Sequence, residues 1–514
     1  MKDKNRYGQY FTHRIIAEFM AGMITHDTSA KVLEPSCGKG VFLEALAGKG
    51  YTDVDAYEID KSLGAPAGGI RYESFVSSPM DKYDVVIGNP PYIRWKNLED
   101  ELKSELEHSP LWQRHFNSLC DYMFIFILKS IEQLTDGGEL IFICSDYWIN
   151  TTHSATLRDY MAVHGYFSDI YHFREAPLFD GVNASLMIFR YVKSAVQPAT
   201  IRLYDYNDDK RFPDPARLAG KECFTMTEIP QFKAGARWLL AGSETQELLK
   251  SFETSCVKHG GGTLFGGTEL HRIGEYCDIG NGMVSGLDKA FNLGSLPALN
   301  EAEDESTLKV LKAKDLRPYV HGPESRYFFI NSRVTEDEFE RLYPNVCRHL
   351  APYRQALAKR YDYGKDIPYW EFVFPRNYKL FARDEKRIFV PCKERISNKQ
   401  HFRFTLADKD YMPLQDVTGI LKKNDCRESI EYLTAYLNNH RVFEWLKYNG
   451  ITKGYIVEFS EAPIASIPYR PIRWDNISEQ AIHDKITENV RRYVATKDMQ
   501  YINDINDNFN TLFS

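Results

Sequence analysis

The stretch 83–92, Tyr-Asp-Val-Val-Ile-Gly-Asn-Pro-Pro-Tyr, constrains the fold of this chain more than any other. Its first half is a short apolar run without alternation, which predicts a buried parallel strand. Pro90 and Pro91 have no N–H to give to a sheet, and Pro90 keeps Asn89 out of the helical region. Asn89 and Tyr92 are therefore expected on a stiff turn at the carboxyl end of a strand, where open α/β sheets bind ligands. An amide oxygen and a backbone carbonyl beside an aromatic ring suit a planar NH2 group on a flat ring.

Predicted strands and helices alternate on both sides of this stretch. A helix is expected just after Thr12, which is a plausible N-cap. Further strands are predicted over 54–60, 139–144, 167–173 and 184–191, and a strand from 31 is expected to run into a glycine-bearing turn that ends at 40. Further helices are predicted from 41, over 121–134 with Gly137 and Gly138 ending it, and around 154–164. This alternation predicts a doubly wound α/β sheet, and the last two strands, which are joined directly, predict an antiparallel edge.

The turn at 34–40, Glu-Pro-Ser-Cys-Gly-Lys-Gly, joins the first strand to its helix. It lacks the Gly-x-Gly-x-x-Gly pattern of dinucleotide sites and the Gly-Lys-Ser/Thr ending of a phosphate-binding loop. Its glycines still let a ligand approach the backbone closely. About twenty residues on, Glu58 ends the second strand, where a carboxylate can accept hydrogen bonds from ribose hydroxyls, and Asp60 is the second choice. A nucleoside site without a pyrophosphate clamp fits S-adenosylmethionine better than NAD.

Four motifs occur in a fixed order: Gly-Gln-Tyr-Phe-Thr, Leu-Glu-Pro-Ser-Cys-Gly-Lys-Gly, Tyr-Glu-Ile-Asp and Gly-Asn-Pro-Pro-Tyr-Ile. This order resembles the Taq-type (gamma-order) DNA adenine-N6 methyltransferases, specifically over residues 5–193 and more loosely over 278–471. The resemblance implies a Rossmann-like methyltransferase sheet with an antiparallel edge in a catalytic domain at 1–235, which includes a connecting region from about 195. It also implies a C-terminal α+β DNA target-recognition domain at 236–514.

The resemblance assigns roles to individual residues. Asn89 and the Pro90 carbonyl would bind the target amino group, Tyr92 would stack on the base, and Phe179 would sandwich it from the other side. The residues expected around S-adenosylmethionine are Thr12, Glu34, Ser36, Gly38, Gly40, Glu58, Ile59, Glu73, Asn89 and Pro91. Two acceptors on the amine hydrogens would turn its lone pair out of the ring plane, toward the sulfonium methyl. A base inside a duplex has to be flipped out to reach them.

The charge of the chain is unevenly distributed. The net charge is −7, but residues 307–405 carry 21 Lys and Arg against 12 Asp and Glu, so the rest is near −16. A basic block in an acidic protein is compatible with a polyanion-binding face, although a solvated basic surface gives the same composition. The residues expected to contact DNA are Lys289, Arg376, Asn377, Lys393 and Arg395. Arg and Asn recognise guanine and adenine edges, but half or more of such hydrogen bonds go to the backbone.

The second half of the chain gives weaker structural signals. Residues 195–241 have no clean period and are expected to connect the two domains, and the glycines at 260–267 indicate an irregular patch. Residues 277–291 resemble a glycine-rich hairpin. Residues 428–448 have the pattern of one amphipathic helix.

Composition excludes several classes of protein. Nine scattered cysteines without a Cys-x-x-Cys pair argue against a disulfide framework or a metal site and for a reducing, cytoplasmic location. No apolar run is long enough for a membrane span, and no signal-peptide core is present. The expected partners are double-stranded DNA and, where one exists, a restriction endonuclease on a separate chain, and the protein is expected to be a monomer.

The Asn-Pro-Pro-Tyr turn leaves alternatives open. RNA adenine and protein glutamine N-methyltransferases use the same chemistry on a planar NH2 group. Glutamine methyltransferases of that kind have a helical domain before the catalytic one, whereas the motifs here start near residue 5. An inactive methyltransferase fold serving as a DNA-binding subunit is a further alternative. It is disfavoured because Glu58, Asn89 and Tyr92 are all present.

Overall fold

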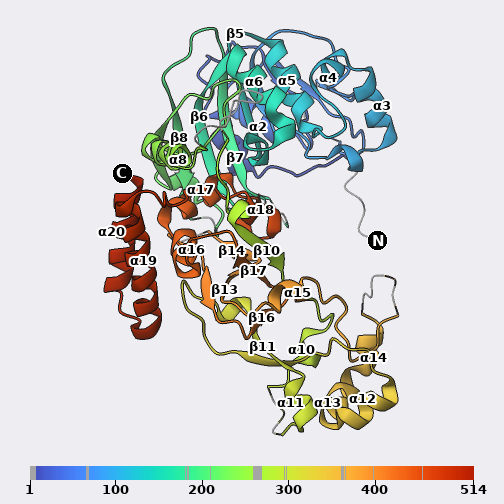
Figure 1. The fold of residues 1–514 in the computed structure, drawn as a ribbon. Helices are drawn as coiled ribbons and strands as arrows, with labels where there is room; N and C mark the ends of the chain where they lie inside the picture. Colours follow the sequence, from blue (N-terminus) through green and yellow to red (C-terminus); the bar gives the residue numbers. More distant parts are fainter. Residues whose placement is uncertain are drawn as a thin grey trace. The chain divides into compact units, whose positions relative to one another are not determined.

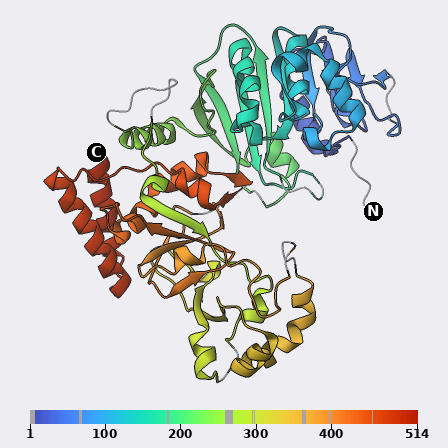
Figure 2. The same cartoon turned by 45° about the vertical axis from the view of Figure 1, so that its right-hand side comes forward.

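The computed structural model describes residues 7–64, 69–179, 181, 184–208, 210–258, 269–294, 296, 298–360, 364, 366–396, 399–453 and 455–514. It divides into two compact units, Met1–Gln246 and Glu247–Ser514, which Figures 1 and 2 draw from two directions. The predicted patch at 260–267 lies outside the described residues. None of the described helices is both long and apolar enough to cross a membrane.

Unit 1 is built on one mixed sheet. Its strands are β1 (Val32–Glu34), β2 (Val54–Tyr57), β3 (Ile70–Arg71), β4 (Tyr83–Gly88), β5 (Leu134–Ser145), β6 (Gly165–Arg174), β7 (Leu186–Lys193), β8 (Thr200–Tyr206) and β9 (Phe224–Pro230). Their order in the sheet is β3-β2-β1-β4-β5-β7-β6-β8-β9. The strands from β3 to β5 are parallel, β7 is antiparallel to both of its neighbours, and β9 is an antiparallel edge. The predicted fold class is confirmed.

Helices cover both faces of this sheet (Figure 1). They are α1 (Arg14–Ala21), α2 (Val41–Gly48), α3 (Asp100–His108), α4 (Pro110–His115), α5 (Met123–Gln133), α6 (Ala155–His164) and α7 (Pro215–Ala219), with short 3-10 turns at Trp95–Asn97, Tyr147–Ile149 and Thr152–Ser154. Alternate residues of β5 enter two cores: Leu140 and Phe142 pack with α3 to α6, whereas Ile141 and Ile143 pack with α1, α2 and α7. Burial on both faces explains the unbroken apolar runs.

Two local predictions at helix ends are wrong. Helix α1 is capped by His13, whose ring accepts from the Ile15 amide, because the Thr12 hydroxyl accepts a hydrogen bond from Asn89 instead. Gly137 and Gly138 do not end the preceding helix. They lie inside β5, which begins at Leu134 directly after α5.

The region 195–241 is not merely a connection. It contains β8, α7 and β9, and β8 pairs in parallel with β6. The antiparallel pair β6 and β7 is therefore interior, and the edge of the sheet is β9. Ile201 and Leu203 of β8 pack into one core and Tyr204 and Tyr206 into the other, so β8 is buried on both faces toward its carboxyl end.

Unit 2 is an α+β unit with three small sheets. Its strands are β10 (Cys277–Asn281), β11 (Thr307–Leu311), β12 (Ser325–Phe328), β13 (Arg387–Pro391), β14 (Lys393–Arg395), β15 (Thr405–Ala407), β16 (Tyr411–Pro413), β17 (Val417–Lys422), β18 (Thr452–Lys453) and β19 (Ile456–Glu458). The sheet orders are β10-β17-β13-β15, β12-β11-β16 and β14-β19-β18. The predicted hairpin at 277–291 is wrong, because β10 pairs with the distant β17.

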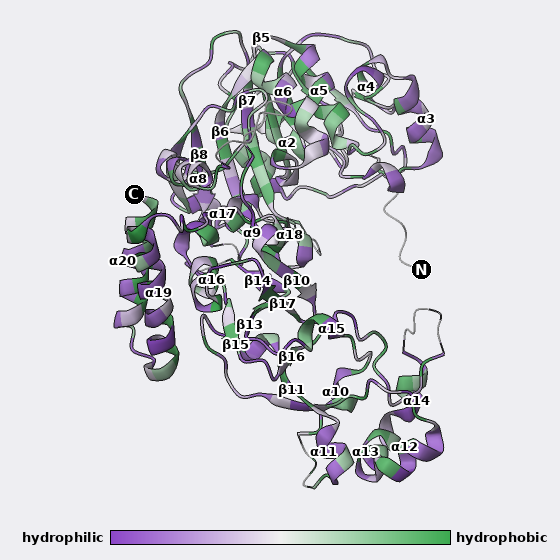
Figure 3. Cartoon of the chain, in the orientation of Figure 1, coloured by the Kyte–Doolittle hydropathy of each residue, from purple (hydrophilic) through white to green (hydrophobic). Residues whose placement is uncertain are grey.

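The helices of unit 2 lie around these sheets. They are α9 (Ile273–Tyr276), α10 (Asp288–Phe291), α11 (Glu301–Glu305), α12 (Glu336–Leu342), α13 (Pro344–Leu350), α14 (Arg354–Ala358), α15 (Tyr378–Phe381), α16 (Ile430–Leu437), α17 (His440–Asn449), α18 (Glu461–Ala465), α19 (Ile477–Thr496) and α20 (Gln500–Phe513), with 3-10 turns at Ala313–Asp315 and Ala351–Tyr353; α8 (Ser243–Ser255) spans the division between the units. Figure 3 shows α19 as largely hydrophilic, in contrast to the apolar strands around β5.

The single helix predicted over 428–448 is two helices, α16 and α17. Asn438 caps the end of α16, and the Asn439 side chain accepts from the Arg441 amide to start α17. Every residue of α16 is buried, so it is not the amphipathic surface helix that its pattern predicts. Asn at both positions is the signal that sequence reasoning missed.

Candidate functional site

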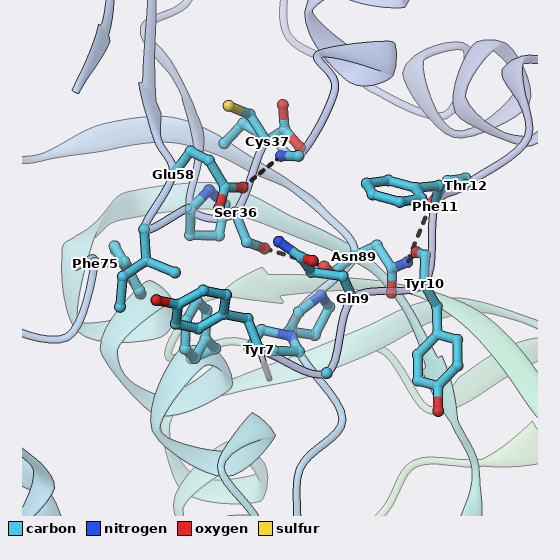
Figure 4. A pocket seen from close by; sticks show the side chains of 18 of the residues that line it. Tyr7, Gln9, Tyr10, Phe11, Thr12, Ser36, Cys37, Glu58, Phe75 and Asn89 are labelled. Atoms are coloured by element: carbon cyan, nitrogen blue, oxygen red, sulfur yellow. Dashed lines mark hydrogen bonds between the residues drawn. The ribbon is translucent and has the colours of Figure 1, made fainter. Parts of the chain in front are cut away.

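A cavity of about 330 Å³ lies at the carboxyl ends of the central parallel strands in unit 1 (Figure 4). The strand order reverses between β1 and β4, which is the topological switch point where open α/β sheets bind ligands. The lining comes from the segment 7–12, the turn after β1, the end of β2, residues 74 and 75, the Asn-Pro-Pro turn after β4, and helices α3 and α5. Elements far apart in the sequence thus form one site.

Most residues predicted to bind the cofactor line this cavity. They are Thr12, Glu34, Ser36, Gly38, Glu58, Ile59, Asn89 and Pro91, joined by Pro90. Gly40 is the left-handed N-cap of α2 and does not line it. Glu73 is exposed and also lies outside the lining, whereas its neighbours Ser74 and Phe75 are part of it.

Glu58 is held at the end of β2 by two backbone amides. Gly38 N donates to Glu58 Oε2 and Asp60 N donates to Glu58 Oε1, both at 2.7 Å. Burial raises the pKa of Glu58, and these two hydrogen bonds offset part of that rise. Gly38 has φ +54, a conformation that suits glycine and turns its amide toward the carboxylate.

Glu34 is the second carboxylate of the cavity and is almost fully buried. Burial and the nearby Glu58 carboxylate raise the pKa of Glu34 well above its ordinary value. Its Oε2 atom is buried and has no hydrogen-bond partner among the described residues. Buried polar atoms are nearly always satisfied in native proteins, so this oxygen marks a place where a polar partner is missing.

The Asn-Pro-Pro-Tyr turn is held in place by hydrogen bonds from several elements. Asn89 Nδ2 donates to Tyr10 O at 2.6 Å and to Thr12 Oγ1 at 3.1 Å, and Ser36 Oγ donates to Asn89 O at 3.0 Å. The Tyr92 hydroxyl lies within hydrogen-bond distance of Asn89 Oδ1 and 2.8 Å from Ile143 O on β5. Burial raises the pKa of Tyr92 well above its ordinary value, so this hydroxyl is a donor at neutral pH.

Two aromatic residues predicted to hold the base lie next to the cavity rather than in its lining. Tyr92 is partly buried, and Phe179 is 5% exposed in the core beneath α1 and α2. The Tyr10 ring packs against both, with centroid distances of 5.8 Å to Tyr92 and 6.2 Å to Phe179. Figure 4 shows the Tyr10 ring pointing away from Glu58.

Sequence reasoning missed several aromatic residues of the cavity. Tyr7, Phe11, Phe75, Tyr122 and Phe126 all contribute to its lining. Phe11 is 47% exposed and carries the Lys39 ammonium 4.6 Å above its ring centroid. The signal for Phe75 is its place just after β3, the next strand along the same edge of the sheet.

An ionic cluster lies at the ends of β5, β6 and β8. His172 is bonded through Nε2 to Asp146 Oδ2 at 2.8 Å and through Nδ1 to Asp205 Oδ1 at 3.2 Å. Ser185 Oγ donates to the same Asp146 oxygen at 2.5 Å, and Arg174 Nε donates to Asp205 Oδ1 at 3.3 Å. Burial opposes the charged imidazole, yet the two aspartates raise the pKa of His172 to about 9.

The residues predicted to contact DNA are spread over unit 2. Lys289 is exposed, and Lys393 and Arg395 are exposed on β14 on either side of the buried Glu394. Arg376 is partly buried and donates from Nε to Gly282 O at 2.7 Å. Asn377 is exposed with φ +59.

The doubly wound sheet and the cavity at its switch point define a class of α/β proteins that bind nucleotides and related cofactors at this edge of the sheet. The family of Eco57I restriction-modification methylases matches residues 57–179. The chain is 43% identical over 509 residues to the type II methyltransferase M.HindII of Haemophilus influenzae strain Rd, covering 98% of this chain and 97% of the relative. It is 40% identical over 506 residues to M.HincII of Haemophilus influenzae, with the same coverage of 98% and 97%. The chain therefore belongs to the type II restriction-modification methyltransferases.

A solved structure has a similar fold over nearly the whole chain. The type IIL restriction-modification enzyme MmeI in complex with DNA matches with a TM-score of 0.55 and 10% sequence identity. The match covers 97% of this chain and 71% of that chain. At this identity the likeness concerns the fold alone.

Proposed function

We propose that this DNA methyltransferase transfers a methyl group from S-adenosylmethionine to N6 of an adenine flipped out of duplex DNA at a specific sequence. The observation that carries the proposal is the position of Asn89, at the carboxyl end of β4 and in the wall of the cavity. An amide oxygen and the Pro90 carbonyl at that edge match the two hydrogens of an amino group on a flat ring. The Tyr92 ring beside them matches the ring itself.

The residues of the cavity fit S-adenosylmethionine. Bound there, the cofactor would supply an activated methyl group on a positively charged sulfur. Two acidic side chains, Glu34 and Glu58, line the cavity, and a positively charged group bound beside them would stabilise their ionised forms. Glu58 would hold the ribose hydroxyls, and the Phe75 ring would lie against the adenine. The absence of a pyrophosphate-binding glycine pattern agrees with this choice.

Most of the rate gain would come from positioning. The lone pair of an adenine amino group is delocalised into the ring, so the amine is a poor nucleophile. Asn89 Oδ1 and the Pro90 carbonyl would accept its two hydrogens and orient the lone pair for in-line attack on the methyl carbon. As the N–C bond forms, the electrons of the broken S–C bond would stay on sulfur and the amine would lose one of its hydrogens as a proton. Preorganised acceptors in a site that excludes water supply both orientation and electrostatic stabilisation. Stacking on Tyr92 would offset part of the cost of unstacking the base.

We assign target recognition to the region from 236 onward, in the gamma order of catalytic part first and recognition part second. The exposed Lys289, Lys393 and Arg395 support a DNA-contacting surface in unit 2. The proposal includes double-stranded DNA as the partner, a monomeric protein in the cytoplasm, and any restriction endonuclease on a separate chain.

A single assay separates this function from its alternatives. Purified protein with tritiated S-adenosylmethionine should label unmodified DNA, and should leave RNA and protein unlabelled. Digestion of the labelled DNA should place the label in N6-methyladenine. Labelling of RNA or of glutamine in protein would favour those alternatives, and the absence of any transfer would favour an inactive DNA-binding subunit.

Asn89→Ala tests the role of the turn. The variant should lose at least about 100-fold in kcat, the range seen when a preorganised hydrogen-bonding group is removed. Cofactor affinity, measured by calorimetry, should stay within about threefold of the native protein, because the other contacts in the cavity remain. Undiminished methyl transfer by this variant would overturn the mechanism.

A further inference from the structure

We propose that Tyr10 occupies the place of the target base when no DNA is bound and has to leave that place when the base is inserted. This inference rests on the function proposed above, since it concerns the same base-binding site. It makes Tyr10 a residue that sets how tightly a flipped base is held, a role beyond those of Asn89, Tyr92 and Phe179.

The first observation is the packing of the Tyr10 ring. It lies 5.8 Å from the Tyr92 centroid at an interplanar angle of 29°, and 6.2 Å from the Phe179 centroid at 43°. These are the separations of favourable aromatic pairs. A purine that stacks on this face of Tyr92 and contacts Phe179 needs the same volume. Tyr10 and the base therefore exclude each other.

The second observation is that the Asn89 side chain is already hydrogen-bonded through both its nitrogen and its oxygen. Its Nδ2 group donates to Tyr10 O and Thr12 Oγ1, and its Oδ1 atom accepts from the Tyr92 hydroxyl. An incoming adenine amino group would share Oδ1 with that hydroxyl, which uses one of its two lone pairs, or would displace the hydroxyl. Ile143 O, 2.8 Å from the hydroxyl, offers an alternative acceptor, so the change requires no unsatisfied donor.

The third observation is the tight course of the segment that carries Tyr10. Gly8 has φ +63, and a Cβ atom there would lie 2.3 Å from Ile93 Cγ1, just past the Asn-Pro-Pro-Tyr turn. Glycine alone fits this approach. The segment 7–12 also lines the cofactor cavity. Displacement of Tyr10 by a base would therefore also shift residues that line the cofactor cavity.

Removal of the Tyr10 ring should change the affinity for the base in a direction that can be measured. If the conformation with the ring in place predominates, the apparent affinity for the base is reduced by the fraction of molecules that are open. Removing the ring should then strengthen capture of the base. If Tyr10 were instead a third wall that stacks on the bound base, its removal would weaken capture.

The experiment first requires the methylated sequence, obtained by sequencing modified bases in plasmid DNA from cells that express the protein. A duplex with this sequence and 2-aminopurine at the target position then reports both affinity and extrusion of the base. With S-adenosylhomocysteine present, Tyr10→Ala should bind this duplex threefold to tenfold more tightly and show a larger rise in fluorescence. Tyr10→Phe, which keeps the ring, should stay within twofold of the native protein. Unchanged or weaker binding by Tyr10→Ala would overturn the proposal.

A second measurement does not depend on how well Tyr10→Ala folds. With 3-fluorotyrosine placed at position 10 of the otherwise native chain, the ¹⁹F resonance should shift on addition of the mapped duplex and not of a duplex lacking the site. An unchanged resonance would contradict displacement of the ring. Failure of the proposed function is distinct from both results, because the native protein would then transfer no methyl group to adenine.

Discussion

Glu58 combines two roles at the residue level. It orders the turn after β1 by accepting from the Gly38 and Asp60 amides, and it faces the cavity with its remaining lone pairs. A side chain that serves both fold and ligand tolerates little change. Glu58 could be predicted from sequence because it follows the second strand directly, whereas the unpaired oxygen of Glu34 depends on tertiary packing that the sequence does not display.

Glu58→Gln should weaken binding of S-adenosylmethionine. The glutamine side chain has one accepting oxygen where glutamate has two, so one charge-assisted hydrogen bond, worth about 1.5–3 kcal/mol, is lost. Isothermal titration calorimetry should show a Kd about 10-fold to 100-fold higher than that of the native protein. Asp53→Asn, which changes an exposed carboxylate at the start of β2, is the matched control and should bind as the native protein does.

At the level of elements, the cluster around His172, which lies on β6, joins the ends of four strands. Asp146 follows β5, Asp205 lies on β8, and Ser185 precedes β7, so one imidazolium and its partners tie together both sides of the segment that carries Phe179. The charged groups that face the ring are the two aspartates, with Arg174 bonded to Asp205. The cluster is a buried network whose charge state depends on pH.

Stability should therefore fall as the pH rises through the His172 titration. The pKa of His172 is raised from an ordinary 6.5 to about 9, so the contribution is complete below about pH 6.5 and is lost as the pH approaches 9. A shift of this size corresponds to about 3 kcal/mol. His172→Gln should unfold at a lower temperature than the native protein at pH 6, and calorimetry at pH 9.5 should find a much smaller difference. A difference independent of pH would contradict this account.

The main elements of unit 1 could be predicted because their signals are local. The apolar runs of β1, β4 and β5 are buried on both faces, and the ligand-binding turns follow them directly in the sequence. The strands β8 and β9 were missed because β9 is a largely exposed edge strand and its pairing is decided by distant residues. The division between α16 and α17 depends on an asparagine cap. The spacing of apolar residues continues across it, so the hydrophobic pattern alone predicts a single helix.

The site was predicted to the extent that it follows strand ends. Asn89, Glu34 and Glu58 line one cavity because parallel strands bring their carboxyl ends to one edge. The position of Tyr10 against Tyr92 and Phe179 has no local signal. It results from the path of the N-terminal segment across the Asn-Pro-Pro-Tyr turn, which only the tertiary structure contains.

At the level of the whole molecule, the net charge is acidic although residues 307–405 of unit 2 are basic. Lys393 and Arg395 project from β14 while Glu394 between them is buried against Lys399 and Arg403. Alternation along the strand therefore sends the two cations outward together. This arrangement suits contacts with phosphates, which are insensitive to sequence.

Replacing Lys393 and Arg395 by alanine should weaken DNA binding and reduce its salt dependence. Each lost phosphate contact removes about 0.9 from the slope of log Kd against log salt concentration, so the pair should lower it by about 1 to 2. Fluorescence anisotropy with a duplex over a range of salt concentrations measures both quantities. The control replaces Lys485 and Lys497, two exposed lysines on the α19–α20 side of the unit. Equal slopes for both variants would rule out β14 as a DNA contact.

The end of β5 supports both aromatic side chains proposed to enclose the base. Ile143 O lies 2.8 Å from the Tyr92 hydroxyl, and Asp146, three residues later, accepts from the two sides of the Phe179 segment. A strand advances about 3.3 Å per residue, so the backbone itself spaces these anchors by about 10 Å. An insertion or deletion between 143 and 146 would change this spacing, whereas a substitution of a side chain there would not. Among homologues we expect the length of this short stretch to vary less than its composition.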